Sequence, residues 1–388
     1  MQVYFDNAAT TPLDNEVFEA MKPFMVEHFG NPSSIHAHGR EVRAAIEQAR
    51  KTVAALLNTS PSEIFFTSGG TEADNTAIIC TIRTLGIKHA ITSEIEHPAV
   101  LNSFNNLENN GEIKLSFVKL DNKGHIIIES LEELLKNNSG SFVSLMHGNN
   151  EIGNLNDIDT IGQLCEQYKA IFHSDTVQTM CHFKHDIQKL KTHFIVGSAH
   201  KFHGPKGVGF LYLNDKLKIK PFIDGGGQER NMRGGTENVY GIIGLAKAME
   251  IAYRDMEVHK KHIQGLKSRM IKKVVDNIEN VGFNGDCTSE DKSLYTVLNI
   301  SLPESDINEM LLFSLDIEHI SASGGSACSS GASVGSHVLK AIKADPGRGA
   351  VRFSFSKYNT EEEVDYVADK LVEMYKGAKR MAPPVGGA

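Results

Sequence analysis

The sequence predicts an α/β protein whose mostly parallel sheet is covered by helices on both faces. Between residues 40 and 213, short apolar runs typical of buried strands alternate with segments whose apolar residues recur at helical spacing. Strands joined through helices pair in parallel with right-handed crossovers, and the helices cover both faces. After two long helices, a shorter series of strands and helices predicts a second, smaller unit.

The first predicted elements flank two turns. YFDNAATTPLD reads as a short strand that breaks into a polar turn at Asn7, which could close over a site or simply begin the domain. A helix with one continuous apolar face is expected from Arg40 to Leu57. The strand at 63–67 then leads through Ser68-Gly69-Gly70-Thr71 into a helix from Glu72 to Leu85.

The alternation of strands and helices continues along the chain. Strands are expected at 89–93, 114–118, 141–147, 170–175, 193–196 and 208–213, and helices at 98–109, 131–137 and 158–168. In folds of this kind ligands bind beyond the carboxyl ends of the strands. We therefore expect the polar residues that follow these strands to face one cleft: His97, Asn150, Asp175 and Gln178.

The C-terminal third predicts the smaller unit. A glycine-rich polar loop at 225–236 precedes two connecting helices, at 239–254 and 257–280. The unit itself contains strands at 294–302 and 350–356, helices at 307–316 and 337–343, and a last helix that opens with the capping box Thr360 to Glu363. We expect a large domain of residues 15–255 and a small α+β domain of residues 1–14 and 256–388.

Composition excludes several classes of protein. The chain has 388 residues, 40% hydrophobic and 23% charged, and none of its apolar runs approaches the ~18 residues of a membrane span. A net charge of −8 without a basic stripe argues against nucleic-acid binding. The N-terminus has no secretory signal pattern, so a cytoplasmic location is expected. Three close histidine pairs lack matching acid or cysteine ligands, and no metal site is predicted.

Lys201 is the first candidate for chemistry. It lies in GSAHKFHGPKGVGF, between two predicted buried strands. Burial lowers the pKa of a lysine amine, and a partly neutral amine is what Schiff-base chemistry with pyridoxal phosphate requires. On this stretch alone, a loop lysine in a tight turn is an equal alternative, and Lys206 is a rival in the same loop.

Two segments suit a phosphate. The Gly69-Gly70-Thr71 turn places free backbone N–H groups and a hydroxyl at a positive helix terminus, although it matches no P-loop or dinucleotide motif and a plain turn is the commoner reading. In the loop at 225–236, Arg230, Arg233 and Thr236 would also suit an anion.

These features converge on one cofactor. Pyridoxal phosphate requires a lysine for its aldehyde, a helix start for its phosphate and a carboxylate for its ring nitrogen, which Asp175 could supply. Cys328 lies in GGSACSSG, a loop without a large apolar residue to bury it. Thiolates are strong nucleophiles, and free cysteines in soluble proteins are usually buried, as we expect for Cys80 and Cys165. Cys328 is therefore a candidate nucleophile.

The chain resembles the cysteine desulfurases among the fold-type I pyridoxal-phosphate-dependent transferases, in the long-loop subgroup linked to iron–sulfur assembly and nitrogen fixation. The resemblance runs nearly from end to end, through DNAATTP, GNPSS, FTSGGTEADN, EHPAV, NNEIG, HSDTVQ, SAHKFHGPKG, GGGQERNMRGGTEN, SGGSACSSG and VRFSFS. It implies a large domain with a mostly parallel seven-stranded sheet and a smaller α+β domain that carries the cysteine loop.

The resemblance also implies how pyridoxal 5'-phosphate is held, as a Schiff base on Lys201. The other implied contacts are Gly70, Thr71, Ser198 and His200 around the phosphate and Schiff base, Asp175 at the ring nitrogen, Gln178 at the ring hydroxyl, Asn150 at the ring, and His97 stacked on the ring face. Thr236 would reach the phosphate of a neighbouring subunit, which implies a homodimer with composite sites.

For the reaction, the resemblance implies that Cys328, Lys201 and His97 are catalytic and that L-cysteine is the substrate. Arg352 would grip the substrate carboxylate, and Asn7 lies in the turn that would close over it. The products would be L-alanine and a persulfide on Cys328, which passes its sulfur to an acceptor or iron–sulfur scaffold protein. The alternatives are a selenocysteine lyase or aminotransferase on the same fold, or a catalytically silent scaffold.

Overall fold

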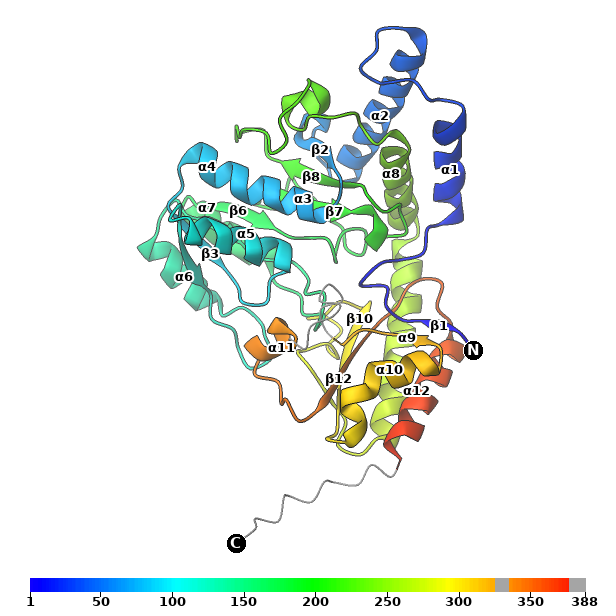
Figure 1. Ribbon diagram of the computed structural model, residues 1–388. Helices are drawn as coiled ribbons and strands as arrows, with labels where there is room; N and C mark the ends of the chain where they lie inside the picture. Colours follow the sequence, from blue (N-terminus) through cyan, green and yellow to red (C-terminus); the bar gives the residue numbers. More distant parts are fainter. Residues whose placement is uncertain (325–334, 377–388) are drawn as a thin grey trace.

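The computed structural model describes residues 1–324 and 335–376. Figure 1 shows two layered parts linked by the long helix α9 (Met256–Asn277). In the larger part, seven strands follow the order β2-β8-β7-β6-β5-β3-β4. Their bounds are β2 (Ile64–Thr67), β3 (His89–Thr92), β4 (Lys114–Phe117), β5 (Phe142–Ser144), β6 (Ile171–Ser174), β7 (Phe194–Ser198) and β8 (Gly209–Leu213). The predicted fold class is confirmed.

The sheet is parallel except at β8, which runs antiparallel to both β2 and β7. One antiparallel strand agrees with the mostly parallel seven-stranded sheet that was predicted. The link from β7 to β8 contains only residues 199–208 and no crossover helix. Because a parallel connection needs a dozen or more residues, such a short link returns the chain in the opposite direction.

Helices cover both faces of this sheet, as predicted. They are α1 (Asn15–Val26), α2 (Ala37–Leu56), α3 (Gly70–Asn75), α4 (Thr81–Leu85), α5 (Pro98–Asn109), α6 (Ile128–Asn137), α7 (Ile158–Gln167) and α8 (Val239–Arg254). The strand pleat explains the two layers, since neighbouring side chains point to opposite faces. Phe66 packs in the cluster built with α1, α2 and α8, whereas Phe65 packs in the cluster built with α3 and α5.

The smaller part contains an antiparallel sheet of β9 (Gly282–Phe283), β10 (Val297–Leu302) and β12 (Gly349–Ser354). Its helices are α10 (Leu311–Ile317), α11 (His337–Ala341) and α12 (Glu361–Tyr375). The N-terminal strand β1 (Val3–Tyr4) pairs in parallel with β11 (Ile320–Ser321), and Val3 and Phe5 join the core of this part. The division into domains of residues 15–255 and of residues 1–14 with 256–388 stays a proposal.

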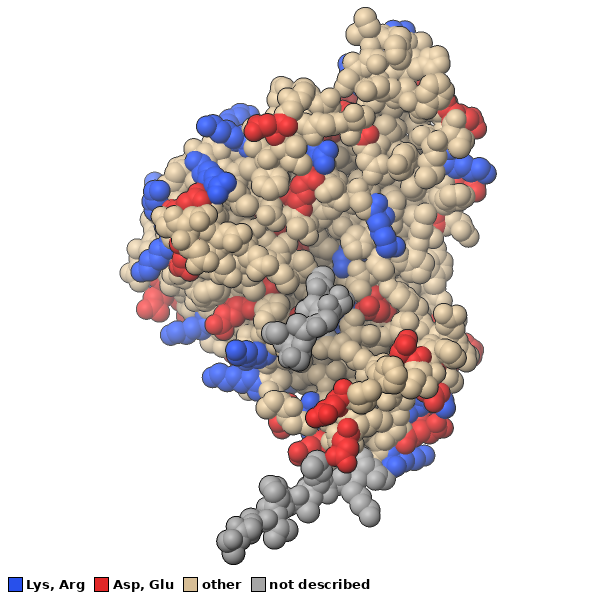
Figure 2. Space-filling model, viewed as in Figure 1, with Lys and Arg blue, Asp and Glu red and all other residues tan. Residues whose placement is uncertain are grey.

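Some elements differ from the predictions. Helix α1 was not predicted, because Phe18, Met25 and Val26 are exposed and blur its apolar face. The predicted helix at 72–85 is three segments, α3, a π-helical turn at Thr76–Cys80, and α4. None of the described helices is long and apolar enough to cross a membrane. On the face in Figure 2, Lys and Arg side chains lie scattered among acids rather than in a stripe.

Candidate active site

A cavity of about 340 Å³ lies at the carboxyl ends of β2, β3, β5, β6 and β7, where the sequence predicted a cleft. The predicted site residues that line it are Gly70, Thr71, His97, Asn150, Asp175, Gln178, Ser198, His200, Lys201 and Arg352. These positions are up to 282 residues apart, from Gly70 to Arg352, and the topology of the sheet brings them together. The cavity also contains Asp74 and Met146, which the sequence analysis did not select.

Lys201 ends a short 3₁₀ turn, Ala199–Lys201, between β7 and β8. Its Nζ donates hydrogen bonds to the carbonyl oxygens of Ala8 and Ala9, at 2.6 and 2.9 Å. The amine is therefore held against the N-terminal turn at one wall of the cavity. Lys206 lines an adjoining, more open cavity of about 380 Å³ and not this one. The position of the two side chains therefore favours Lys201 over Lys206 as the Schiff-base lysine.

Asp175 and His97 line the same cavity, on the segments that follow β6 and β3. Asp175 follows β6, is buried, and accepts a hydrogen bond from the Val177 N–H at 2.9 Å. His97 is the N-cap of α5, and its Nδ1 accepts from the Ala99 N–H at 3.1 Å. Burial lowers the pKa of His97, and Lys201 also lowers it, against the opposing effect of Asp175. A neutral imidazole is the expected form at neutral pH.

The start of α3 lies close to β6 and β7. A Cβ on Gly70 would lie 2.7 Å from Val177 Cγ2, so only glycine lets the backbone approach this closely. Gly70, Thr71, Ser198 and His200 line both the main cavity and the adjoining one. Burial, then Lys201 and Lys206, lower the pKa of His200 to about 4. This corner offers backbone N–H groups, hydroxyls and a neutral ring, which suit a phosphate.

Arg352 reaches the cavity from β12 in the smaller part. Its side chain is buried, Nη1 donates to the Asn150 carbonyl at 2.8 Å, and Nη2 donates to Asp6 Oδ1 at 2.7 Å. Nε is buried without a hydrogen-bond partner among the described residues. Gln178 lies nearby and its Nε2 donates to the Ala8 carbonyl at 3.0 Å. A buried arginine with a spare donor can bind a carboxylate.

Two of the described site residues, Asn7 and Thr236, do not line the cavity. The Asn7 side chain points into the smaller part, where Nδ2 donates to the Ser354 carbonyl at 2.8 Å; its neighbours Ala8 and Ala9 line the cavity instead. Thr236 lines a separate cavity of about 160 Å³ with Arg233. Cys328 lies outside the described residues.

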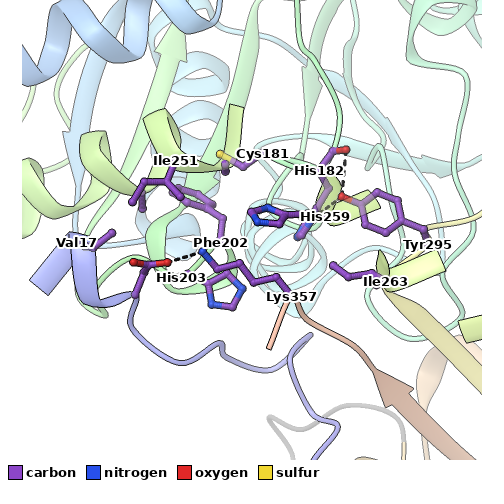
Figure 3. A pocket seen from close by; sticks show the side chains of 13 residues that line it. Val17, Cys181, His182, Phe202, His203, Ile251, His259, Ile263, Tyr295 and Lys357 are labelled. Carbon is purple, nitrogen blue, oxygen red and sulfur yellow. Dashed lines mark hydrogen bonds and ion pairs between the residues drawn. The ribbon is translucent and has the colours of Figure 1, made fainter. Parts of the chain in front are cut away.

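A smaller cavity lies where the two parts of the molecule meet (Figure 3). Its walls include Val17 of α1, Ile251 of α8 and Ile263 of α9, and His182 Nδ1 lies 2.9 Å from the Tyr295 hydroxyl. Its volume of about 30 Å³ is roughly that of one water molecule. A cofactor or an amino acid cannot fit there, so the larger cavity is the candidate site.

The residues of the larger cavity fit pyridoxal phosphate. An amine for an aldehyde, a carboxylate for a ring nitrogen and a phosphate corner surround one space in an α/β sheet. Within the described chain, Asp74, His97 and Asp175 are the group whose ligand atoms could hold a metal, all within 4.8 Å of one another. By its fold and its site, the protein belongs to the class of α/β proteins with a cavity suited to pyridoxal phosphate.

Comparisons with known proteins identify the family. The family model "Aminotransferase class-V" matches residues 3–367, and the chain belongs to this family. It is 41% identical to "Cysteine desulfurase IscS" of Dictyoglomus turgidum, covering 98% of this chain and 96% of that protein. It is 38% identical to "Putative cysteine desulfurase IscS 1" of Bacillus subtilis, covering 97% and 99%. A solved structure titled "NIFS-LIKE PROTEIN" matches with a TM-score of 0.89 at 37% identity, covering 97% of this chain and all of that one.

Proposed function

We propose that this protein is a pyridoxal-phosphate-dependent cysteine desulfurase that converts L-cysteine to L-alanine and holds the released sulfur on Cys328. The observation that carries the proposal is similarity over nearly the whole chain to proteins named cysteine desulfurase, at 38 to 41% identity. The cavity supports it, because Lys201, Asp175 and Arg352 line one space large enough for a cofactor and an amino acid.

When bound, pyridoxal phosphate withdraws electrons from the α-carbon of an amino acid. Lys201 would hold the cofactor aldehyde and move the proton at the substrate α-carbon. Asp175 would face the ring nitrogen, His97 the ring, and Gly70, Thr71, Ser198 and His200 the phosphate. Arg352 would bind the substrate carboxylate through its guanidinium group, since the residue lines the cavity.

Cys328 would receive the sulfur. Its thiolate attacks the substrate sulfur, an S–S bond forms, and the carbon–sulfur bond breaks with its electron pair left on carbon. Protonation of that carbon gives L-alanine, and the enzyme retains a persulfide. We further propose that an acceptor protein takes this sulfur for iron–sulfur cluster assembly or another thio-cofactor.

We also propose a homodimer in which Thr236 reaches the partner's phosphate corner. Two observations support this: Thr236 lies apart from the cavity of its own chain, and exposed apolar side chains gather on and near α1, among them Phe18, Val26, Phe29 and Ile35. A cytoplasmic location stays a prediction.

The test uses the purified holoenzyme incubated with L-cysteine. The expected result is L-alanine together with a mass increase of one sulfur on the peptide that contains Cys328, removed by a reducing thiol. The Cys328→Ala variant should release no sulfide while still binding the cofactor. Full sulfur release by Cys328→Ala would contradict the proposal and favour another enzyme of this fold.

A further inference from the structure

Asp74 is a buried acid of the cavity to which the proposed reaction assigns no role. It lies on α3, four residues after Gly70, and its exposure is 1%. The residue lines the cavity with Asp175 and Lys201. Oδ1 is buried and has no hydrogen bond within the described residues, although it lies 3.3 Å from His173 Nε2. A native protein rarely leaves such an atom unsatisfied, so this contact needs an explanation.

The state of His173 supplies the explanation. Burial lowers the pKa of His173 to about 3, so the ring is neutral and carries one N–H. Ser144 Oγ lies 2.8 Å from Nδ1, and a serine hydroxyl can donate to that atom. The proton of His173 then lies on Nε2, 3.3 Å from Asp74 Oδ1. This tautomer places an N–H beside a buried oxygen that has no hydrogen bond of its own within the described residues.

The surroundings of Asp74 are rich in acids. A carboxylate oxygen of Asp74 lies within 4.8 Å of one of Asp175, and a ring nitrogen of His97 lies at the same site. Glu96, fully buried, accepts from Ser93 Oγ at 2.7 Å and from the Met146 N–H. Lys201 is the cation that lines this cavity beside them, with Arg352 at the wall formed by β12. Burial, together with Asp175 and Glu96, raises the pKa of Asp74 well above its usual value.

Asp74 and Asp175 are two buried carboxylates with oxygens within 4.8 Å of each other, so ionisation of both at once is strongly disfavoured. Asp175 already accepts one backbone N–H, from Val177, whereas the described part of the chain gives Asp74 Oδ1 no hydrogen bond. The anion is therefore better stabilised on Asp175, and the extra proton belongs on Asp74. The Asp74 Oδ1 contact with His173 leaves Oδ2 as the oxygen that carries it. The oxygens of Asp74 and Asp175 lie at most 4.8 Å apart, a gap that one bridging water molecule can span.

We propose that Asp74 is a positioning residue that keeps a proton and donates it to Asp175, so that the pair presents one negative charge to the ring nitrogen of the cofactor. Ser144 and His173 fix the orientation of Asp74 from behind. The inference rests on the proposed binding of pyridoxal phosphate and not on the sulfur chemistry. It makes the ring-nitrogen site a two-carboxylate unit rather than a single aspartate.

The first test needs no cofactor. Infrared spectra of the cofactor-stripped protein at neutral pH should contain carboxylic-acid C=O bands from buried protonated groups. Asp74→Asn should remove one such band, whereas Glu96→Gln, a matched buried control, should remove a different one and leave the Asp74 band in place. Asp74→Asn with an unchanged carboxylic-acid region would overturn the proposal, whatever reaction the enzyme catalyses.

The second test measures the dissociation constant of pyridoxal phosphate for the stripped protein by fluorescence quenching across pH. Asp74→Asn should bind within about twofold of the wild type, because its amide donates to Asp175 and cannot ionise. Asp74→Leu should bind about tenfold more weakly, since Asp175 loses its donor. Wild-type affinity should fall at alkaline pH as Asp74 ionises, and Asp74→Asn should lack this fall. Equal losses in both variants would indicate a merely structural role.

These outcomes separate the two proposals. A protein that binds the cofactor as described but makes no persulfide would contradict the desulfurase function and leave the Asp74 inference supported. Normal persulfide formation, with no change of the carboxylic-acid infrared band in Asp74→Asn, would support the desulfurase function and contradict the Asp74 inference.

Discussion

Arg352 Nη2 donates a hydrogen bond to Asp6 Oδ1 at 2.7 Å, and this bond ties strand β12 to the N-terminal turn. The same Asp6 oxygen accepts from Ser323 Oγ at 2.9 Å, just after β11. A side chain at the start of the chain therefore fixes the rotamer of an arginine near its end. That rotamer decides whether the guanidinium faces the cavity.

The Asp6 contact predicts a defect in substrate binding. Asp6→Ala should raise the KM for L-cysteine about tenfold, because a hydrogen bond between charged groups is worth about 1.5–3 kcal/mol. The kcat should change less, since Lys201 is untouched. Steady-state alanine formation measures both constants. Asp365→Ala, which removes an exposed ion pair with Arg269, is the control and should leave KM unchanged. An unaltered KM in Asp6→Ala would contradict the role.

The two lysines of the turn predict opposite outcomes. Lys201→Ala should not retain pyridoxal phosphate as a borohydride-fixed adduct, because Lys201 is the lysine that lines the main cavity among the described residues. Lys206→Ala should retain the adduct, since that residue lines the adjoining cavity. Mass analysis of the reduced proteins distinguishes them. An adduct that persists in Lys201→Ala and disappears in Lys206→Ala would reverse the assignment.

Gly70 predicts a steric effect that can be relieved. In Gly70→Ala the new Cβ would lie 2.7 Å from Val177 Cγ2, and overpacking of this kind costs about 1–3 kcal/mol. Thermal unfolding should show the loss, and cofactor affinity should fall as α3 shifts. Adding Val177→Ala should recover much of both. If the double variant is no better than Gly70→Ala, the contact with Val177 is not the cause.

A buried ion pair predicts the stability of the loop that carries Thr236. Arg50 and Glu229 form two hydrogen bonds of 2.8 Å, and Glu229 also accepts from the Phe66 N–H. Glu229→Gln leaves the Arg50 charge buried without a counter-charge and should cost about 3 kcal/mol in urea unfolding. Glu229→Gln combined with Arg50→Met should recover part of this loss, because the Phe66 bond is retained. Additive losses would contradict the pairing.

His182 predicts sensitivity to acid. Burial lowers its pKa from 6.5 to about 4, with a smaller opposing effect of a hydrogen bond. The unfolded state therefore binds more protons between these values, and stability falls as pH falls, by roughly 3 kcal/mol in total for this group. His182→Gln should lose less stability than wild type between pH 7 and 5 in urea titrations. The exposed His38→Gln is the control and should follow the wild type.

The strands and helices could be predicted because the spacing of apolar residues that indicates each one lies within its own short segment. Helices α5 and α8 begin and end where their apolar spacing, Pro98 and Arg254 indicated. The direction of β8 could not be read from its own residues, because it depends on the short link that begins at Ala199. Boundaries differ where a cap decides them: His36 caps α2, so the helix begins at Ala37, three residues before the predicted start.

The site was predicted mainly through motifs, and its exceptions have physical causes. Asn7 was expected at the cavity, but it lies in a turn where its side chain bonds to the Ser354 carbonyl of the smaller part, and Ala8 lies at the wall instead. Asp74 was missed because an acid in a helix pattern reads as a solvated residue. Its burial comes from His173 and Asp175, about 100 residues further along the chain. The only local signal was its place four residues after Gly70, on the same helix face.

The antiparallel course of β8 has a consequence for hydrogen exchange. Strands β7 and β8 pair through five residue pairs, from Phe194 with Leu213 to Ser198 with Gly209. The turn that carries Lys201 is therefore anchored at both ends within the sheet. Amide hydrogens in these strands should exchange only when the whole domain opens. Lys201 therefore belongs to the same cooperative folding unit as the sheet. A destabilising mutation in that unit lowers the fraction of folded molecules and leaves the place of the amine in each folded molecule unchanged.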